Sequence, residues 1–400
     1  MKSKLLATSA LVAAGVVGMT DAAFAQAKVA PITAVLGGYH EQTFGYAQNE
    51  DGVIGNNLGL TTNSSKPAKW KQSSDSEVWF GGRTTLANGI SVGFDVQLEG
   101  NTQGDQIDES YLFVDGAFGR LVLGSENAAD YIMHVAAPGA GKAYGPLESS
   151  AFDWITRPNN FVAITTTAGR LVRDSPQSDG AFTAGGFTGV GDDMNRITYY
   201  TPRFWGLQAG VSFTPGNIED ASANAGVVDR TSTRAYGWTG ALNYTNTFGQ
   251  FMVAASAGIS YWPGADNRSA AQTAGAGDDI IDYSFGLNLG FAGFVVGGAY
   301  RRYDAGDANI NDGHAWNIGV TYTTGPFAVG LSFHEGKAEG LTTTGGEDRY
   351  RQLLGSAAYT LGPGVDLIGS IFWIQYENDG GTQADNNEGI GVVGGIRLSF

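Results

Sequence analysis

The feature that most constrains the fold is a repeated alternation of apolar and polar residues, interrupted by short turns rich in glycine, asparagine and proline. The segments beside these turns run about 9 to 14 residues, near the length of a tilted strand that crosses a membrane. Seven short turns join sixteen strands when both chain ends lie on the same side. The sequence therefore predicts an all-β fold of sixteen antiparallel strands. The turns fall at residues 87–89, 116–119, 202–206, 246–249, 291–293, 324–326 and 361–364.

The composition supports an all-β fold and excludes several functions. The 61 glycines, 21 phenylalanines, 17 tyrosines and 8 tryptophans are typical of many strands joined by loops. The chain has no cysteine and only 4 histidines, which argues against disulfides, thiolate metal sites and zinc enzymes, so we expect no cofactor. With 23 basic and 39 acidic residues the net charge is −16, which repels a phosphate backbone. We expect no nucleic-acid partner.

The N-terminal segment has the pattern of an export signal. Two lysines precede an apolar run over residues 5–19, and Ala23-Phe24-Ala25 matches the small-residue pattern of a cleavage site. We therefore predict a signal peptide over residues 1–25 and an exported protein over residues 26–400. No later run approaches the ~18 apolar residues that a membrane helix needs. If the exported protein spans a membrane, it does so as a closed β-barrel.

The connections between the short-turn hairpins are long and polar, so the two rims of the predicted sheet differ. Short turns on one rim and long loops on the other are typical of outer-membrane barrels. A soluble β-sandwich would show the same strand alternation with its apolar face turned inward. The long connections cover residues 49–74, 216–231, 263–279, 304–313, 335–348 and 377–388.

Side-chain alternation also indicates which face of the sheet meets lipid. In residues 251–261 the odd-numbered positions are mostly apolar and the even-numbered positions are mostly small or polar, and residues 281–289 repeat the pattern. Aromatic residues near the strand ends predict girdles at the two membrane interfaces. These are Tyr236, Trp238, Tyr244, Tyr261, Trp262, Trp316, Tyr322, Phe372 and Trp373.

One interval between turns is much longer than the others. Successive short turns lie about 30 to 45 residues apart, but about 85 residues separate Phe118 from Pro202. The surplus forms one loop over residues 126–194, after a strand at residues 120–125. Loops of this length are usually functional or disordered, and the aromatic residues within this one favour a packed loop. The only covered place for it is the inside of the barrel.

Several segments resemble the general porins of Gram-negative outer membranes, of the alpha-proteobacterial type. Residues 83–99 are similar to an early porin hairpin, and residues 108–124 to the strand pair before the constriction loop. Residues 195–202 with 206–213 are similar to the hairpin after that loop. The last strand, residues 396–400, resembles the terminal signal that the barrel-insertion machinery reads, an alternating apolar strand ending in phenylalanine, here Phe400.

The resemblance implies a 16-stranded antiparallel transmembrane β-barrel in the cell outer membrane, usually a homotrimer. In the family, the third external loop folds inward and narrows a water-filled pore. In this chain residues 126–194 occupy the place of that loop. They depart from the family pattern because they are more numerous and lack a tip motif such as Pro-Glu-Phe-Gly-Gly.

Four basic residues are candidates for the wall of the constriction, which selects by size and by the field of its lining charges. Successive strand residues face opposite sides, and the neighbours of Arg83, Arg196 and Arg397 belong to the outward apolar set. These three arginines are therefore predicted to face the lumen. Lys71, at the start of the second strand, is a further candidate. Basic residues on the wall opposite loop carboxylates would set a field across the pore. Each of them is alternatively a solvated charge in the lumen or at a rim.

The long loop supplies the opposing candidates. Glu148 and Asp153 flank an apolar segment and are predicted constriction acids, whereas Arg157, with Arg170 and Arg173, is predicted to pin the loop to the wall. All of them are alternatively solvated loop charges. The net negative charge suggests a weak cation preference if the acids line the path.

Other motifs do not point to chemistry. Residues 89–93 match the G-x-S-x-G nucleophile pattern, but a turn precedes them and a strand follows, so we predict no enzymatic activity. Acidic pairs at residues 192–193, 278–279 and 347–348 are predicted to stay hydrated, with loop-bound calcium as the alternative.

Together these observations predict an outer-membrane channel, surrounded by lipid, through which ions and small hydrophilic solutes diffuse passively. Two alternatives stay open. Phe152, Trp154 and Phe161 in the loop are compatible with a channel selective for a sugar or a carboxylate. A secreted all-β adhesion or binding protein is the other alternative, and it would lack lipid-facing aromatics and the terminal signal at Phe400.

Overall fold

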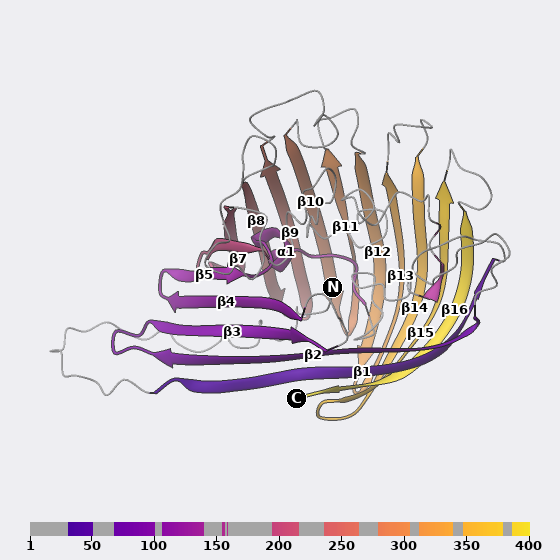
Figure 1. Ribbon diagram of the computed structural model, residues 1–400, viewed down its shortest axis with the longest axis horizontal. Coiled ribbons are helices and arrows are strands. Elements are labelled where there is room, and N and C mark those ends of the chain that lie inside the picture. The colour runs from indigo at the N-terminus through magenta and orange to yellow at the C-terminus, as the bar shows by residue number, and fades with distance from the viewer. Residues whose placement is uncertain are drawn as a thin grey trace.

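The computed structural model describes residues 31–50, 68–100, 106–139, 154–156, 158, 194–215, 236–263, 279–304, 312–338, 347–378 and 386–400. The strands are β1 (Thr33–Asn49), β2 (Trp70–Thr85), β3 (Ser91–Glu99), β4 (Ile107–Gly116), β5 (Gly119–Ser125), β6 (Asn195–Tyr200), β7 (Leu207–Thr214), β8 (Gly237–Phe248), β9 (Phe251–Trp262), β10 (Ile280–Phe291), β11 (Phe294–Asp304), β12 (Gly313–Thr324), β13 (Phe327–Ala338), β14 (Asp348–Gly362), β15 (Val365–Asn378) and β16 (Asn387–Ser399). These sixteen strands form one closed antiparallel barrel, in which β1 pairs with β16 (Figure 1). The predicted fold class is confirmed.

All seven predicted short turns are present, and they join β2–β3, β4–β5, β6–β7, β8–β9, β10–β11, β12–β13 and β14–β15. We call their end of the barrel the short-turn rim and the opposite end the long-loop rim. The turn between β10 and β11 shows why the sequence can reverse so tightly. Ala292 and Gly293 both have positive φ, 50° and 87°, which fits a two-residue hairpin turn whose twist matches that of its strands.

Strand lengths vary more than the alternation predicted, from 6 residues in β6 to 17 in β1. The prediction of a loop over residues 49–74 was wrong at its C-terminal end, because Trp70 to Ser74 are paired with β1. Their polar character suggested a loop, but these residues extend β2 in its pairing with β1. Strands β5 and β6 are short because the chain leaves the wall at Ser125 and returns at Asn195.

The alternation of faces is confirmed. On β9 and β10 the outward side chains are the predicted apolar ones, and Ile259, Phe285 and Leu289 are about half exposed. The inward set carries small and polar groups such as Ser256, Ser260 and Ser284. A closed apolar exterior of this size would be a large exposed patch in water, whereas lipid tails solvate it.

Aromatic side chains form belts at both rims of the barrel. At the short-turn rim, ring centroids lie 4.6 Å apart for Phe251 and Phe291 and 4.4 Å apart for Phe294 and Tyr322. At the long-loop rim, Phe213 and Trp238 are 4.5 Å apart, and Trp316 and Phe333 5.2 Å apart. These pairs stabilise the interfaces that border the lipid.

The assignment of Trp262 and Phe372 to these belts was wrong, because both are only 2% exposed and point inward. Their neighbours Tyr261 and Trp373 hold the outward positions. Successive strand residues face opposite sides, so only one member of an adjacent aromatic pair can meet lipid.

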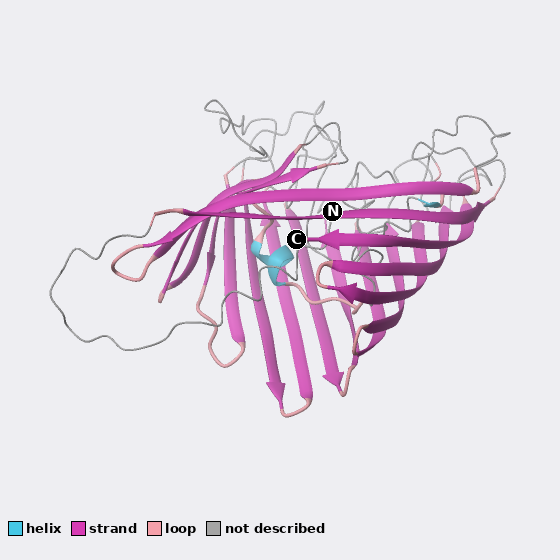
Figure 2. Cartoon of the chain, turned by 90° about the horizontal axis from the view of Figure 1, so that it is seen from below, coloured by secondary structure: helices cyan, strands magenta, loops and turns pink. Residues whose placement is uncertain are grey.

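A short helix, α1 (Ala129–Met133), follows β5 and is seen within the ring of strands (Figure 2). It contacts the inner sides of β6 to β9. Among the residues that the structure describes, no helix has the length and apolar character needed to cross a membrane.

Candidate pore and constriction site

The first part of the long loop, residues 126–139, is attached to the inner wall by a row of small polar side chains. These side chains come from β7, β8, β9 and β12, and each forms a hydrogen bond with the loop backbone. These bonds satisfy backbone groups of residues 126–139 that would otherwise be buried unpaired. The bonds run from Ala129 N to Ser212 Oγ (2.9 Å), from Asn243 Nδ2 to Met133 O (2.8 Å), from Val135 N to Ser256 Oγ (2.7 Å) and from Ala137 N to Asn317 Oδ1 (3.0 Å).

Helix α1 also packs against the wall through apolar contacts. Ala129 and Met133 are buried in a cluster with residues of β4, β5, β6 and β8. A Cβ on Gly210 would lie 2.5 Å from Met133 Sδ, so the helix can approach β7 only because this wall position has no side chain. Asp130 accepts a hydrogen bond from Ser260 Oγ at 3.0 Å.

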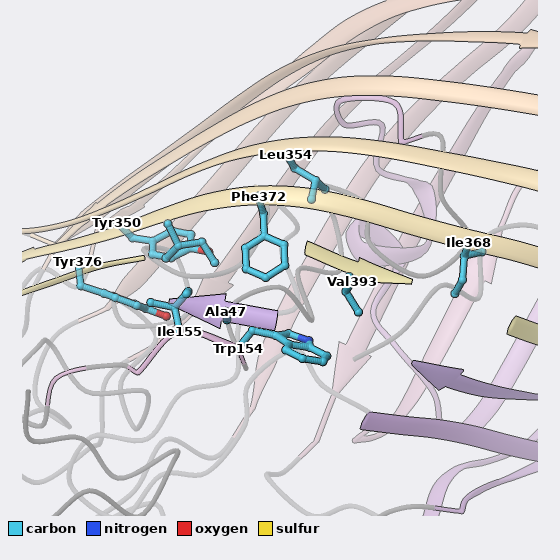
Figure 3. Close-up of a cluster of buried hydrophobic side chains, with 10 residues drawn as sticks. Ala47, Trp154, Ile155, Tyr350, Leu354, Ile368, Phe372, Tyr376 and Val393 are labelled. Carbon is cyan, nitrogen blue, oxygen red and sulfur yellow. The ribbon is translucent and has the colours of Figure 1, made fainter. Parts of the chain in front are cut away.

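The second described part of the loop, Trp154 to Thr156, lies on a different part of the wall. Trp154 and Ile155 are buried in an apolar cluster on the inner faces of β14, β15, β16 and β1 (Figure 3). This stretch of wall is apolar although it faces the lumen, which is explained by the loop that covers it. The wall residues of the cluster are Ala47, Tyr350, Leu354, Ile368, Phe372, Ile374, Tyr376 and Val393.

The described parts of the long loop therefore lie inside the barrel, as predicted. The first described part is held at strands β7 to β12, and the second is held at strands β14, β15, β16 and β1.

Two predicted basic residues lie on the inner face of β2 and are partly exposed. Lys71 Nζ is 5.5 Å from the ring centroid of Trp154, so it is brought against the loop. Arg83 pairs across the sheet with Thr33 and Gly93, two residues from the end of its strand at the short-turn rim. The inward direction of both side chains agrees with parity.

The other two predicted wall residues are buried in contacts of their own. Arg196 is 2% exposed and its Nε donates to Met194 O at 3.1 Å. Arg397 Nη1 lies 3.5 Å from Glu41 Oε2, and its guanidinium stacks over the ring of Tyr39 at 4.0 Å. Constriction roles for these residues stay predictions. Glu148, Asp153 and Arg157 lie outside the described residues.

Sequence reasoning missed a row of carboxylates on the inner face of β1 to β4. In register, Glu41 lies opposite Asp75, and Glu77 lies opposite Glu99. Carboxylate oxygens of Glu77, Glu99 and Asp108 all lie within 4.8 Å of one another. The signal was present in the sequence, because Asp75 with Glu77 and Asp95 with Glu99 alternate with the outward apolar set at even spacing.

A closed sixteen-stranded barrel with a lipid-facing exterior and an inward-folded loop defines the class of outer-membrane channels. The profile of the Gram-negative porin family matches residues 7–381. The chain belongs to this family, whose members are channels of the outer membrane.

Solved porin structures share the fold at low sequence identity. The anion-selective porin from Comamonas acidovorans is 14% identical with a TM-score of 0.57, and the match covers 92% of this chain and 100% of that one. OmpF of Salmonella typhi is 14% identical with a TM-score of 0.54, covering 92% and 97%. The trimer form of OmpT from Vibrio cholerae is 13% identical with a TM-score of 0.52, covering 92% and 99%. Comparison with curated protein sequences finds no match.

Proposed function

We propose that the protein is a general diffusion porin that passes ions and small hydrophilic solutes down their gradients and prefers cations. No energy source and no catalytic step are part of this proposal. The observation that supports it is that one barrel holds both a loop fixed inside it and an acidic inner wall on β1 to β4. The loop supports selection by size, and the wall supports selection by charge.

The cation preference rests on the placement of the carboxylates. Like charges directly opposite each other in a sheet are destabilising, so Glu77 opposite Glu99 has a cost that folding alone does not explain. Asp75, Glu99 and Asp108 are partly exposed on the inner face. Carboxylates in a narrow lumen with low-dielectric walls concentrate cations and repel anions. Lys71 and Arg83 on the same face would then shape the field across the pore, as proposed from the sequence.

We also propose that the mature protein, residues 26–400, assembles as a homotrimer. The outer face of β1 and β2 supports a protein contact, because Gln42, Ser74 and Ser76 lie there among lipid-facing apolar residues. Polar groups in this band are costly against lipid tails and less costly against another subunit. A similar fold is described as a trimer in OmpT of Vibrio cholerae.

Solute uptake into liposomes tests the diffusion function. With uncharged sugars of increasing size, swelling rates of vesicles that contain the protein should fall steeply with solute size and rise linearly with concentration. Saturation by one sugar or carboxylate would favour the selective channel instead. Folded protein that supports no uptake would refute the channel function for this chain.

A further inference from the structure

The place where the barrel closes is also a place where the second described part of the long loop, Trp154 to Thr156, contacts the wall. Strands β1 and β16 are the first and last in the chain, and their pairing runs from Tyr39 opposite Ser399 to Asn49 opposite Gly389. Asn49 ends β1 and Asn387 begins β16. Both lie at the long-loop rim, beside Trp154 and Thr156 of the loop.

The two asparagines and the loop form one connected hydrogen-bond network. Thr156 N donates to Asn49 Oδ1 at 2.6 Å, and Asn49 Nδ2 donates to Trp154 O at 3.3 Å. Asn387 Nδ2 donates to Thr156 O at 2.6 Å and lies 3.2 Å from Asn49 Oδ1. Glu50 N donates to Asn387 Oδ1 at 3.2 Å. An amide supplies a donor and an acceptor on one short side chain, which neither alanine nor aspartate does.

The wall at this point is shaped to receive the loop. A Cβ on Gly389 would lie 2.4 Å from Ile155 Cδ1 and 2.7 Å from Gln48 O, and a Cβ on Gly45 would lie 2.5 Å from Val392 O and 3.1 Å from Trp154 Cη2, so these glycines admit both the neighbouring strand and the loop. Both glycines belong to the closing strands, β16 and β1. The ammonium group of Lys71 lies over the Trp154 ring, 5.5 Å from its centroid. The segment from Trp154 to Thr156 is thus held by apolar, polar and cation–π contacts within three residues.

We propose that Asn49 and Asn387 are positioning residues that clamp the constriction loop to the closing seam of the barrel. The clamp fixes the position of Trp154 to Thr156 on the wall. The pore therefore keeps one size and conducts at one steady level. It also ties the first and last strands together at the long-loop rim, where their own pairing ends. The effect of the clamp on conductance rests on the proposed channel function. The clamp itself rests only on the hydrogen bonds described above.

The clamp can be measured without any channel recording. The chain has no cysteine, and Thr156 is fully buried, so Thr156→Cys places one thiol at the clamp. In folded protein the rate of thiol labelling reports the fraction of time that the segment is released. Asn387→Asp and Asn49→Ala each remove donors to the loop, and we expect labelling to accelerate about tenfold. Gln48→Ala, on the exposed outward side chain next to Asn49, should leave the rate unchanged.

The same variants are then recorded in planar bilayers. We expect Asn387→Asp to add frequent partial closures that Gln48→Ala does not show. A cysteine pair, Asn49→Cys with Thr156→Cys, replaces the polar clamp by a covalent one in a single folded protein. The oxidised pair should conduct steadily and the reduced pair should fluctuate.

The outcomes separate the two proposals. Labelling rates equal to those of the parent in both asparagine variants, or equally steady currents from the oxidised and reduced pair, would overturn the clamp. Folded parent protein that carries no current would instead overturn the channel function, while the labelling rates would still decide whether the clamp exists.

Discussion

Replacing Trp154 by alanine should release the constriction loop from the wall. The indole is 2% exposed and lies in the apolar cluster of β14, β15, β16 and β1. Truncating a buried tryptophan to alanine typically costs about 3–5 kcal/mol. If this cost falls on docking of the loop, the released fraction rises roughly a hundredfold to a few thousandfold. The barrel itself should still fold, because its strand pairing does not depend on this side chain.

The assay is thiol labelling of Thr156→Cys, compared with and without Trp154→Ala. The labelling rate should rise by at least about a hundredfold, following the released fraction. Trp373→Ala is the matched control, since Trp373 is on β15 within the same wall but points outward. Acceleration below about tenfold, or equal acceleration in the control, would refute the assignment of this cluster as the loop anchor.

Three further predictions concern other parts of the account. Gly389→Ala should disturb both loop docking and the pairing of β16 with β1, and so broaden single-channel current levels, because the new Cβ would meet Ile155 and the backbone oxygen of Gln48; unchanged levels would contradict the packing. Burial and Arg301 lower the pKa of His134 from 6.5 to about 4, so the released loop binds more protons than the docked loop between these values. Docking of residues 126–139 should be constant above about pH 6.5 and weaken as the pH falls toward about 4. His134→Gln should flatten the profile of labelling at Ala137→Cys, a fully buried position of the same part of the loop, when each rate is divided by that of the unfolded chain at the same pH; a parent profile that is already flat would argue against a neutral buried His134. Deleting Phe400 should reduce the amount of folded protein recovered from the outer membrane fraction, and full recovery would remove its role as an insertion signal.

Most of the fold could be predicted because it depends on local pattern. The turns are set by glycine, asparagine and proline at short range, and the lipid face is set by alternation within each strand. Tyr261 and Trp262 show the limit of this reasoning. Their composition suggests an aromatic belt, but only parity decides that Tyr261 faces lipid and Trp262 faces the lumen.

The candidate site could be predicted only in part. That the loop folds inward follows from its length, but its anchors depend on contacts between distant segments. Ser212 and Asn317 are ordinary inward polar residues until the loop backbone is placed beside them. Leu354 and Ile368 are apolar residues on the lumen face, which alternation alone cannot explain before Trp154 is seen to cover that wall.

The acidic wall was accessible from the sequence and was missed. Asp75, Glu77 and Glu99 alternate with outward apolar residues in the same way as the predicted arginines, so the same spacing places them inward. The opposition of Glu77 and Glu99 across β2 and β3 depends on strand register, which the turn at residues 87–89 fixes.

The reversal potential of the purified protein in a potassium chloride gradient is the most direct test of the proposed cation preference. An acidic inner wall should give a cation-to-anion permeability ratio above unity, since even a lumen potential of about one kT changes this ratio about sevenfold. Replacing Asp75, Glu99 and Asp108 by their amides should lower the ratio at least about threefold. The same change at the outward residues Glu335, Glu377 and Glu388 should leave it unaltered. The proposed cation preference would be contradicted by a parent channel that prefers chloride, or by a permeability ratio that does not respond to the inner carboxylates.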